Sequence, residues 1–393
     1  MNLRWVRDDF PAVAQVGYLN TGTLGPMPWP VVRKFQQMVE DYHRQGPALP
    51  GAGEMIRVKA AECRERLASL LGAKREEIAL MESTSAGINA ALLSIAWEPG
   101  DEVIITDIEH AAVSIAVHHL QSRYWAKPVV VASRHGNVTA AQIEEAVTRR
   151  TKAVCLSHVS YCTGGRLPIE EIARVVEAHR LLLVVDGAQS AGAVDVNLDE
   201  LGCHFYAFPG YKWLLGPEGT AGLFVRADVA KVSLVSQAGF RGVNFTGPGG
   251  DYEPAGGARR FELSTMSGLN FAALSGSLDY LESAGAGRGH IGNHDAALAS
   301  TFKRLLAGTP GVTLLTPKAA GESGALVAFT VAGVEGADAL DQAVRWLLNT
   351  RRFLIRAVRQ TGVLRASFHL YNTFDEAEAL ATAVRELAAA AAR

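Results

Sequence analysis

Residues 181–226, LLLVVDGAQSAGAVDVNLDELGCHFYAFPGYKWLLGPEGTAGLFVR, carry the pattern from which the fold is predicted. Its first apolar run ends at Asp186, and a second short run, His204 to Phe208, leads to Lys212. An apolar run that ends in a carboxylate predicts a buried parallel strand with the acid at its carboxyl end. Ligands of open α/β sheets bind at that edge, so we expect Asp186 and Lys212 to meet there.

An Asp and a Lys at one sheet edge are the pair that pyridoxal 5'-phosphate requires. The lysine amine bonds covalently to the cofactor, and the carboxylate keeps the pyridine nitrogen protonated so that the ring can accept electrons. Lys212 and Asp186 are therefore predicted as cofactor-binding and catalytic residues.

DGAQ at 186–189, followed by F-x-G-x-K-W-x-x-G-P at 208–217, resembles the class V aminotransferases. These are fold-type I enzymes of the cysteine desulfurase and isopenicillin N epimerase group, and the chain is most similar to their cystine/cysteine C-S lyases. The resemblance extends from Tyr18 to about Asn372. It implies a large three-layer α/β/α domain with a mostly parallel sheet and a small C-terminal α/β domain. The expected divisions are an N-terminal segment at 1–25 that packs with the small domain, the large cofactor-binding domain at 26–269, and the small C-terminal domain at 270–393.

Length and composition favour a large protein core and exclude several function classes. The chain has 393 residues, enough for two or three domains, and a formal net charge of -2 without a basic stripe for nucleic acid. No apolar run is long enough to span a membrane, and the N-terminus lacks the apolar region of a signal peptide. The four cysteines and eleven histidines show no disulfide or metal-ligand spacing. We expect a cytoplasmic protein without metal, nucleic-acid or membrane partners.

A phosphate site is predicted where the strand 78–82 meets Ser83, Thr84 and Ser85 at the start of a helix. Helix N-termini present free N–H groups and a positive dipole end, which suits a phosphate. Ordinary N-capping by Ser83 or Thr84 explains the same residues. The resemblance favours the phosphate, because the family has a Thr pair here, and so implies Thr84 and Ser85 as ligands.

The resemblance implies further cofactor contacts. His110, after Glu109, corresponds to the family's catalytic histidine that stacks on the pyridine ring, and Gln189 of DGAQ contacts the cofactor. Pro209 and Tyr211 replace a hydroxyl residue and a His of the family, so the Tyr211 hydroxyl becomes a candidate phosphate ligand.

A partner subunit is implied by RFELST at 260–265, which resembles the family's R-F-E-x-G-T. The Thr of that motif reaches the phosphate of the neighbouring subunit. Thr265 therefore predicts a homodimer with active sites at the interface.

Substrate contacts come from three places. Arg365, in LRASFHLYN at 364–372, corresponds to the arginine that clamps the substrate α-carboxylate, which a planar guanidinium matches bidentately. Asn20, in the turn YLNTGTLGP at 18–26, corresponds to a residue near that carboxylate, although turn-favouring residues alone also explain the stretch. Tyr161 stands where the family has an Asn, and the C-S lyases carry an aromatic residue there.

An α-amino acid is the substrate that Lys212 and Arg365 together imply. A cysteine desulfurase needs a thiolate from the C-terminal domain, but the last cysteine is Cys203. Without that nucleophile, a sulfur leaving group on Cβ is lost by β-elimination. The predicted activity is therefore a C-S lyase acting on cysteine, cystine or a cysteine S-conjugate, with secondary metabolism as one setting.

Other activities use the same residues. An epimerase resembling isopenicillin N epimerase would reprotonate Cα on the opposite face, with His110 or Tyr161 as the second acid. Transamination and decarboxylation-linked deamination stay open as well. A non-catalytic binding protein on this fold is the alternative of another class, and the intact Lys212, Asp186 and Arg365 argue against it.

Overall fold

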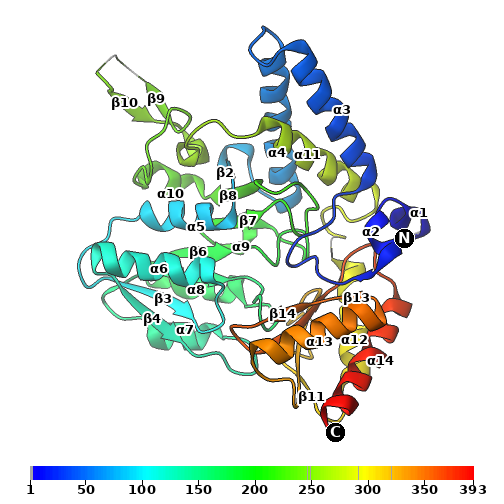
Figure 1. Cartoon of the computed structure of the whole chain (residues 1–393). Coiled ribbons are helices and arrows are strands. Elements are labelled where there is room, and N and C mark those ends of the chain that lie inside the picture. Colours follow the sequence, from blue (N-terminus) through cyan, green and yellow to red (C-terminus); the bar gives the residue numbers. More distant parts are fainter. Residues whose placement is uncertain (1–2, 246, 248, 291, 320) are drawn as a thin grey trace.

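The large domain is organised around a seven-stranded sheet of order β2-β8-β7-β6-β5-β3-β4 (Figure 1). The computed structural model describes residues 3–245, 247, 249–290, 292–319 and 321–393. The strands of this sheet are β2 (Ile78–Met81), β3 (Glu102–Thr106), β4 (Lys127–Val131), β5 (Thr151–Ser157), β6 (Leu182–Asp186), β7 (Phe205–Pro209) and β8 (Ala221–Val225). Neighbouring strands are parallel except in the two pairs that β8 makes. The predicted mostly parallel sheet is confirmed.

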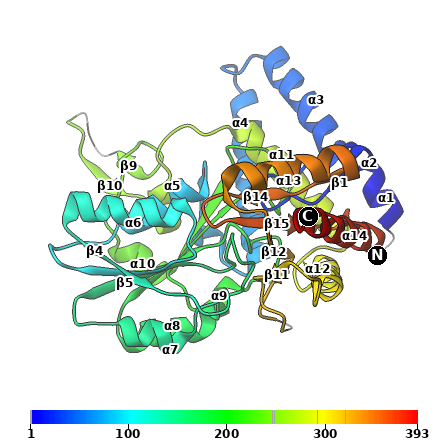
Figure 2. The same cartoon turned by 60° about the horizontal axis from the view of Figure 1, so that its bottom comes forward.

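Helices cover both faces of this sheet (Figure 2). Leu183 and Val185 of β6 pack into one apolar cluster and Val184 into another, because successive side chains of a strand point to opposite faces. The cluster of Val184 contains residues of α5 (Thr84–Leu93), α6 (Ala111–Tyr124) and α10 (Ala227–Val232). The opposite cluster contains residues of α7 (Ala140–Ala146), α8 (Ile169–Ala178) and α9 (Leu198–Leu201). The three-layer α/β/α architecture is confirmed.

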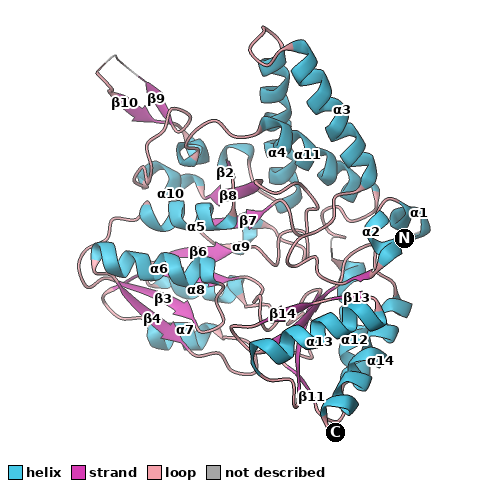
Figure 3. Cartoon of the chain, viewed as in Figure 1, coloured by secondary structure: helices cyan, strands magenta, loops and turns pink. Residues whose placement is uncertain are grey.

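A helical group extends from one end of the sheet. Its members are α3 (Trp29–Gln45), α4 (Ala52–Leu71) and α11 (Gly268–Ser283), and α11 packs against the other two. The predicted domain division stays a prediction, and these contacts favour a boundary after Ser283 rather than after 269. Between β8 and α11 lie the β9 (Val243–Phe245) and β10 (Tyr252–Pro254) hairpin, which projects from the domain in Figure 3, and the 3-10 helix η2 (Gly257–Phe261). A second 3-10 helix, η1 (Arg75–Glu77), precedes β2.

The small domain is a four-stranded antiparallel sheet of order β11-β12-β15-β14 packed against helices. Its strands are β11 (Val312–Leu314), β12 (Leu326–Val331), β14 (Arg356–Val358) and β15 (Val363–Ser367). Its helices are α12 (Asn293–Leu306), α13 (Gly336–Arg351) and α14 (Phe374–Ala391), and they share one apolar cluster with the sheet. None of the described helices is both long and apolar enough to cross a membrane.

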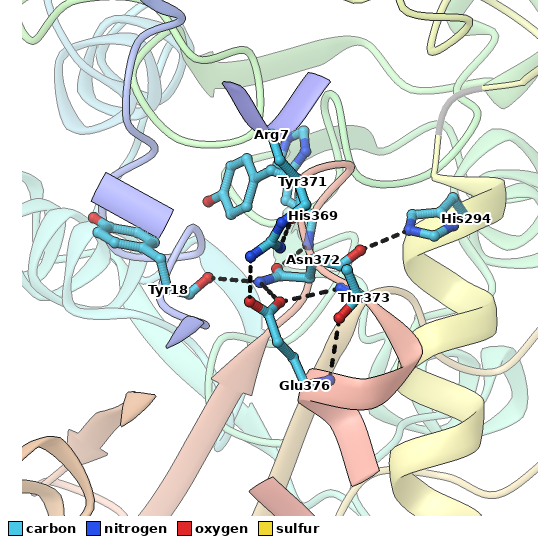
Figure 4. A network of polar contacts seen from close by, with 8 residues as sticks. All are labelled: Arg7, Tyr18, His294, His369, Tyr371, Asn372, Thr373 and Glu376. Atoms are coloured by element: carbon cyan, nitrogen blue, oxygen red, sulfur yellow. Dashed lines mark hydrogen bonds and ion pairs between the residues drawn. The ribbon is translucent and has the colours of Figure 1, made fainter. Parts of the chain in front are cut away.

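The N-terminal segment packs against the small domain. It contains α1 (Leu3–Asp8), α2 (Pro11–Gln15) and β1 (Gly17–Tyr18), and β1 pairs in parallel with β13 (Phe353–Leu354). Figure 4 shows the polar network at this junction, in which the Asn372 amide donates to Tyr18 O at 3.1 Å and to a Glu376 carboxylate oxygen at 3.0 Å. Arg7 pairs with Glu376 at 2.9 Å. One buried amide therefore joins β1 to the start of α14.

Asn372→Ala should lower the free energy of unfolding by about 2–3 kcal/mol, since partly buried Tyr18 O and the backbone N–H of buried His369 would each lose a partner. Urea unfolding measures the change. Asn349→Ala on the exposed side of α13 is the control with the same side-chain truncation. Equal losses in both variants would contradict the role given to Asn372.

Candidate active site

Asp186 and Lys212 lie at the carboxyl edge of the large sheet, as the sequence predicts. Asp186 is the last residue of β6, and Lys212 follows the end of the neighbouring parallel strand β7 by three residues. Asp186 is 3% exposed, and one of its carboxylate oxygens accepts a hydrogen bond from Ala188 N at 2.8 Å. The second oxygen is thus left for another partner in the site.

Burial changes the proton affinity of both groups. It raises the pKa of Asp186, against the attraction of Lys212. It lowers the pKa of Lys212 to about 8, against the attraction of Asp186 and with help from Arg365 and Arg356. Lys212 therefore gives up its proton more readily than a lysine in water, as a base or an amine nucleophile must.

The start of α5 lies at the same edge. Two antiparallel steps, β2 to β8 and β8 to β7, make β2 run in the same direction as β7, so α5 begins where β7 ends. Ser83 caps the helix by accepting from Ala86 N at 3.1 Å. The Thr84 hydroxyl is buried without a hydrogen-bond partner, and Ser85 is exposed. Because Ser83 alone does the capping, Thr84 is left over for a ligand, and an unpaired hydroxyl at a helix N-terminus fits a phosphate.

His110 is the N-cap of α6 and contacts Tyr161. Its Nδ1 accepts from Ala112 N at 3.1 Å, so a neutral ring carries its proton on Nε2. The rings of His110 and Tyr161 meet edge to face, with centroids 5.0 Å apart and planes at 90°. Burial, with the positive charges of Lys212, Arg356 and Arg365, lowers the pKa of His110 to about 4. The imidazole is therefore neutral at neutral pH.

Two arginines face this site from the small domain. Arg365 of β15 is 2% exposed and donates to Tyr161 O at 3.0 Å and to the Thr23 hydroxyl at 2.9 Å. Arg356 of β14 pairs with Arg365 across the strands and donates to the same Thr23 hydroxyl at 3.1 Å. Within the described part of the chain neither guanidinium forms an ion pair with a carboxylate, and Arg365 Nε is buried without a partner. The pair is suited to bind an anion.

Arg356 is not among the substrate contacts predicted from the sequence. The available signal was the Thr361-Gly362 turn between two short apolar runs, which is typical of a hairpin. The strand register then places Arg356 opposite Arg365.

The turn at residues 20–25 lies across these elements. Gly22 O accepts from Gln189 Nε2 at 2.8 Å, and Gln189 Oε1 accepts from Trp213 Nε1 at 3.0 Å. A Cβ on Gly22 would lie 2.8 Å from Gln189 Oε1, so only glycine fits without displacement. The Asn20 side chain accepts from the Thr23 hydroxyl at 2.7 Å. The cofactor role of Gln189 and the substrate role of Asn20 stay predictions.

Tyr211 and Thr265 are the remaining predicted phosphate ligands. Tyr211 accepts a backbone bond from Gly25 N at 2.9 Å, and its partly buried phenol has a raised pKa because of burial. Thr265 is exposed and lines a groove of about 800 Å³ beside α4 and α11, whose lining includes neither Lys212 nor Asp186. Their contacts with the cofactor stay predictions.

All four cysteines are free and buried. In the described ranges, no group of three or more His, Cys, Asp or Glu side chains is arranged to hold a metal ion.

Known proteins resemble this chain over nearly its full length. A cysteine desulfurase, described as probable, from Methanothermobacter thermautotrophicus is 29% identical, with 98% of this chain and 97% of that protein covered. Isopenicillin N epimerase from Streptomyces clavuligerus is 32% identical, with 94% of each covered.

Two structures of the cystine C-S lyase C-DES are similar to this fold. One, with glycine covalently linked to its PLP cofactor, has a TM-score of 0.88 and 26% identity, covering 97% of this chain and 99% of that chain. The other, with the reaction product cysteine persulfide, has a TM-score of 0.87 and 27% identity, covering 96% and 99%.

The family description "Aminotransferase class-V" matches residues 18–380, which include the sheet edge, both arginines and the turn at 20–25. This chain belongs to the class V aminotransferase family.

Proposed function

We propose that the protein is a pyridoxal phosphate-dependent C-S lyase acting on cysteine, cystine or a cysteine S-conjugate. The observation that carries the proposal is that Lys212 shares one site with buried Asp186 and with the Arg356–Arg365 pair. A lysine of lowered pKa can take a proton from Cα, and paired guanidiniums can hold the carboxylate on that carbon.

The residues present fit pyridoxal phosphate. Thr84 and the N-terminus of α5 would hold the phosphate, Asp186 would pair with the ring nitrogen, Lys212 would bond the cofactor and His110 would lie beside the ring. When bound, the cofactor supplies an electron-accepting ring that stabilises negative charge at the substrate Cα.

The chain's own groups then carry the proton transfer and the positioning. Arg365 and Arg356 hold the substrate carboxylate and so fix the orientation of Cα. Lys212 Nζ takes the Cα proton. The electron pair left at Cα forms the Cα=Cβ double bond as the Cβ–S bond breaks, and sulfur departs with the electrons of the broken bond and takes up a proton as a thiol or persulfide. Water then hydrolyses the released aminoacrylate to pyruvate and ammonia.

Thiol chemistry supports a lyase over a desulfurase. A desulfurase requires a thiolate nucleophile, and the small domain contains no cysteine. Cys162 is the cysteine nearest to Tyr161 in sequence, but it is buried and burial raises its pKa, so it stays a thiol. The likeness to the cystine C-S lyase C-DES supports the same choice. Four free, buried thiols also support a cytoplasmic location, where thiols stay reduced.

Epimerisation is the second candidate. It is favoured by the likeness to isopenicillin N epimerase and by the Tyr161 phenol beside His110, which could return a proton to Cα from another direction than Lys212. Pyruvate release separates the two activities, because an epimerase retains the Cβ substituent.

A homodimer is part of the proposal. Thr265 lines the groove beside α4 and α11, and the lining of this groove includes none of the other candidate cofactor ligands. Large apolar side chains are exposed on the adjoining segment, namely Leu234, Phe240, Tyr252 and Leu263. A second copy covering this face would bury them and bring Thr265 to the phosphate of its neighbour.

Lys212→Ala should reduce pyruvate release from L-cystine by about a thousandfold or more, because both the amine nucleophile and the base are lost. The visible absorption of covalently bound cofactor should vanish as well. Lys231→Ala, an exposed lysine of α10, is the control. Pyruvate release that survives in Lys212→Ala would refute the assignment.

Capture of pyridoxal phosphate by the apoprotein should accelerate as pH rises through about 8 and then level off, since the neutral Lys212 amine is the nucleophile. A lysine in water would show this change only near pH ~10. Stopped-flow absorption over this pH range gives the rate. A rate that keeps rising up to pH ~10 would contradict the lowered pKa.

Mixed dimers test the shared site. If Thr265 serves the neighbouring active site, Lys212→Ala and Thr265→Ala chains should form a mixed dimer in which one site is intact. Co-refolding equal amounts should recover about a quarter of wild-type pyruvate release, since half of the dimers are mixed and each has one working site. Thr84→Ala in place of Thr265→Ala is the control, because Thr84 belongs to the site of its own chain and no recovery is expected.

A further inference from the structure

We propose that Thr23 is a positioning residue for the substrate carboxylate, because its hydroxyl joins Arg356 and Arg365 and so presents both guanidiniums to one anion. This inference rests on the proposed function, in which the two arginines bind the carboxylate of an amino acid. Thr23 is not among the site residues predicted from the sequence.

The hydrogen bonds of Thr23 use the full capacity of its hydroxyl. A hydroxyl has one proton to donate and two lone pairs to accept with. Thr23 donates to Asn20 Oδ1 at 2.7 Å, and it accepts from Arg365 Nη2 at 2.9 Å and from Arg356 Nη1 at 3.1 Å. Because Asn20 takes the proton, both lone pairs are left for the arginines. Asn20 therefore orients the hydroxyl.

Repulsion between the two guanidiniums explains why a shared hydrogen-bond acceptor is needed between them. Arg356 and Arg365 are cross-strand partners with like charges, which repel, and burial together with Arg356 lowers the pKa of Arg365 to about 9. The oxygens that contact Arg365 are neutral: the Thr23 hydroxyl and the Tyr161 carbonyl. Arg365 Nε remains buried without a partner. A bound carboxylate would satisfy this donor and offset the repulsion.

Backbone hydrogen bonds connect the turn that contains Thr23 to the residue before the catalytic lysine. Thr23 N donates to Asn20 O at 2.9 Å, which closes the turn, and Gly25 N donates to Tyr211 O at 2.9 Å. Tyr211 precedes Lys212. The turn therefore connects the carboxylate anchor of the small domain to the lysine of the large domain, and the Thr23 hydroxyl sets where the carboxylate sits relative to Lys212.

The test compares two ligands on the holoenzyme, measured by calorimetry. L-2-Aminobutyrate has the amine and the carboxylate but no leaving group, and 1-aminopropane is the same amine without the carboxylate. Thr23→Val should weaken binding of L-2-aminobutyrate about tenfold and leave binding of 1-aminopropane unchanged, since only a charge-assisted contact is disturbed. Thr23→Ser, which keeps the hydroxyl, should bind both as the wild type does. With substrate, Thr23→Val should raise KM more than it lowers kcat.

Two results would overturn the inference. One is equal binding of L-2-aminobutyrate by Thr23→Val and the wild type. The other is a parallel loss for both ligands, or a loss that Thr23→Ser shares, which would mean a general structural role. If Thr23→Val does not fold, Thr23→Ala removes the same hydroxyl without added bulk and serves in its place. Failure of the proposed function is recognised separately, because the wild type would then release no pyruvate from any sulfur substrate.

Discussion

The structure depends on holding several charged side chains together where the carboxyl edge of the large sheet meets the small domain. Lys212, Arg356 and Arg365 bring three basic groups close together. The Asp186 carboxylate attracts Lys212, whereas the two arginines repel it. Such an arrangement is costly for an isolated fold, since like charges repel and partly or fully buried charges lose hydration. Two well-packed sheets maintain it, and the excess positive charge makes the site receptive to a phosphate and a carboxylate.

The N-terminal turn couples the two domains at this site. Its residues contact the small-domain arginines through Thr23 and the large domain through Gly22 and Gly25. The segment before it is fixed to the small domain by β1 and by the Asn372 amide. This short irregular turn therefore determines the distance between the arginine pair and Lys212. An amino-acid substrate must bridge that distance.

Local sequence patterns correctly predicted the strand that ends at Asp186 and the meeting of Asp186 and Lys212 at one sheet edge. The apolar run at 181–186 became β6 (Leu182–Asp186), and parallel pairing brought Lys212 beside Asp186, because the carboxyl ends of parallel strands share an edge. At residues 83–85 the residue types alone fit either N-capping or phosphate binding, and only the family resemblance favoured the phosphate. The structure separates the two roles, with Ser83 as the cap and Thr84 unpaired, since cap geometry depends on backbone angles that residue types alone do not specify.

The fold class, the family resemblance and the Asp186–Lys212 pair were predictable from the amino-acid sequence, because strand period, apolar runs and short motifs are local properties of the chain. The position of Arg356 beside Arg365, their shared contact with Thr23, and the place of Thr265 in a groove that Lys212 does not line became visible only in the folded chain. Those relations depend on cross-strand register and on the approach of segments more than three hundred residues apart, as in the hydrogen bonds from Arg356 and Arg365 to Thr23. Side-chain contacts of that range are set by packing of the whole domain, which no local pattern contains.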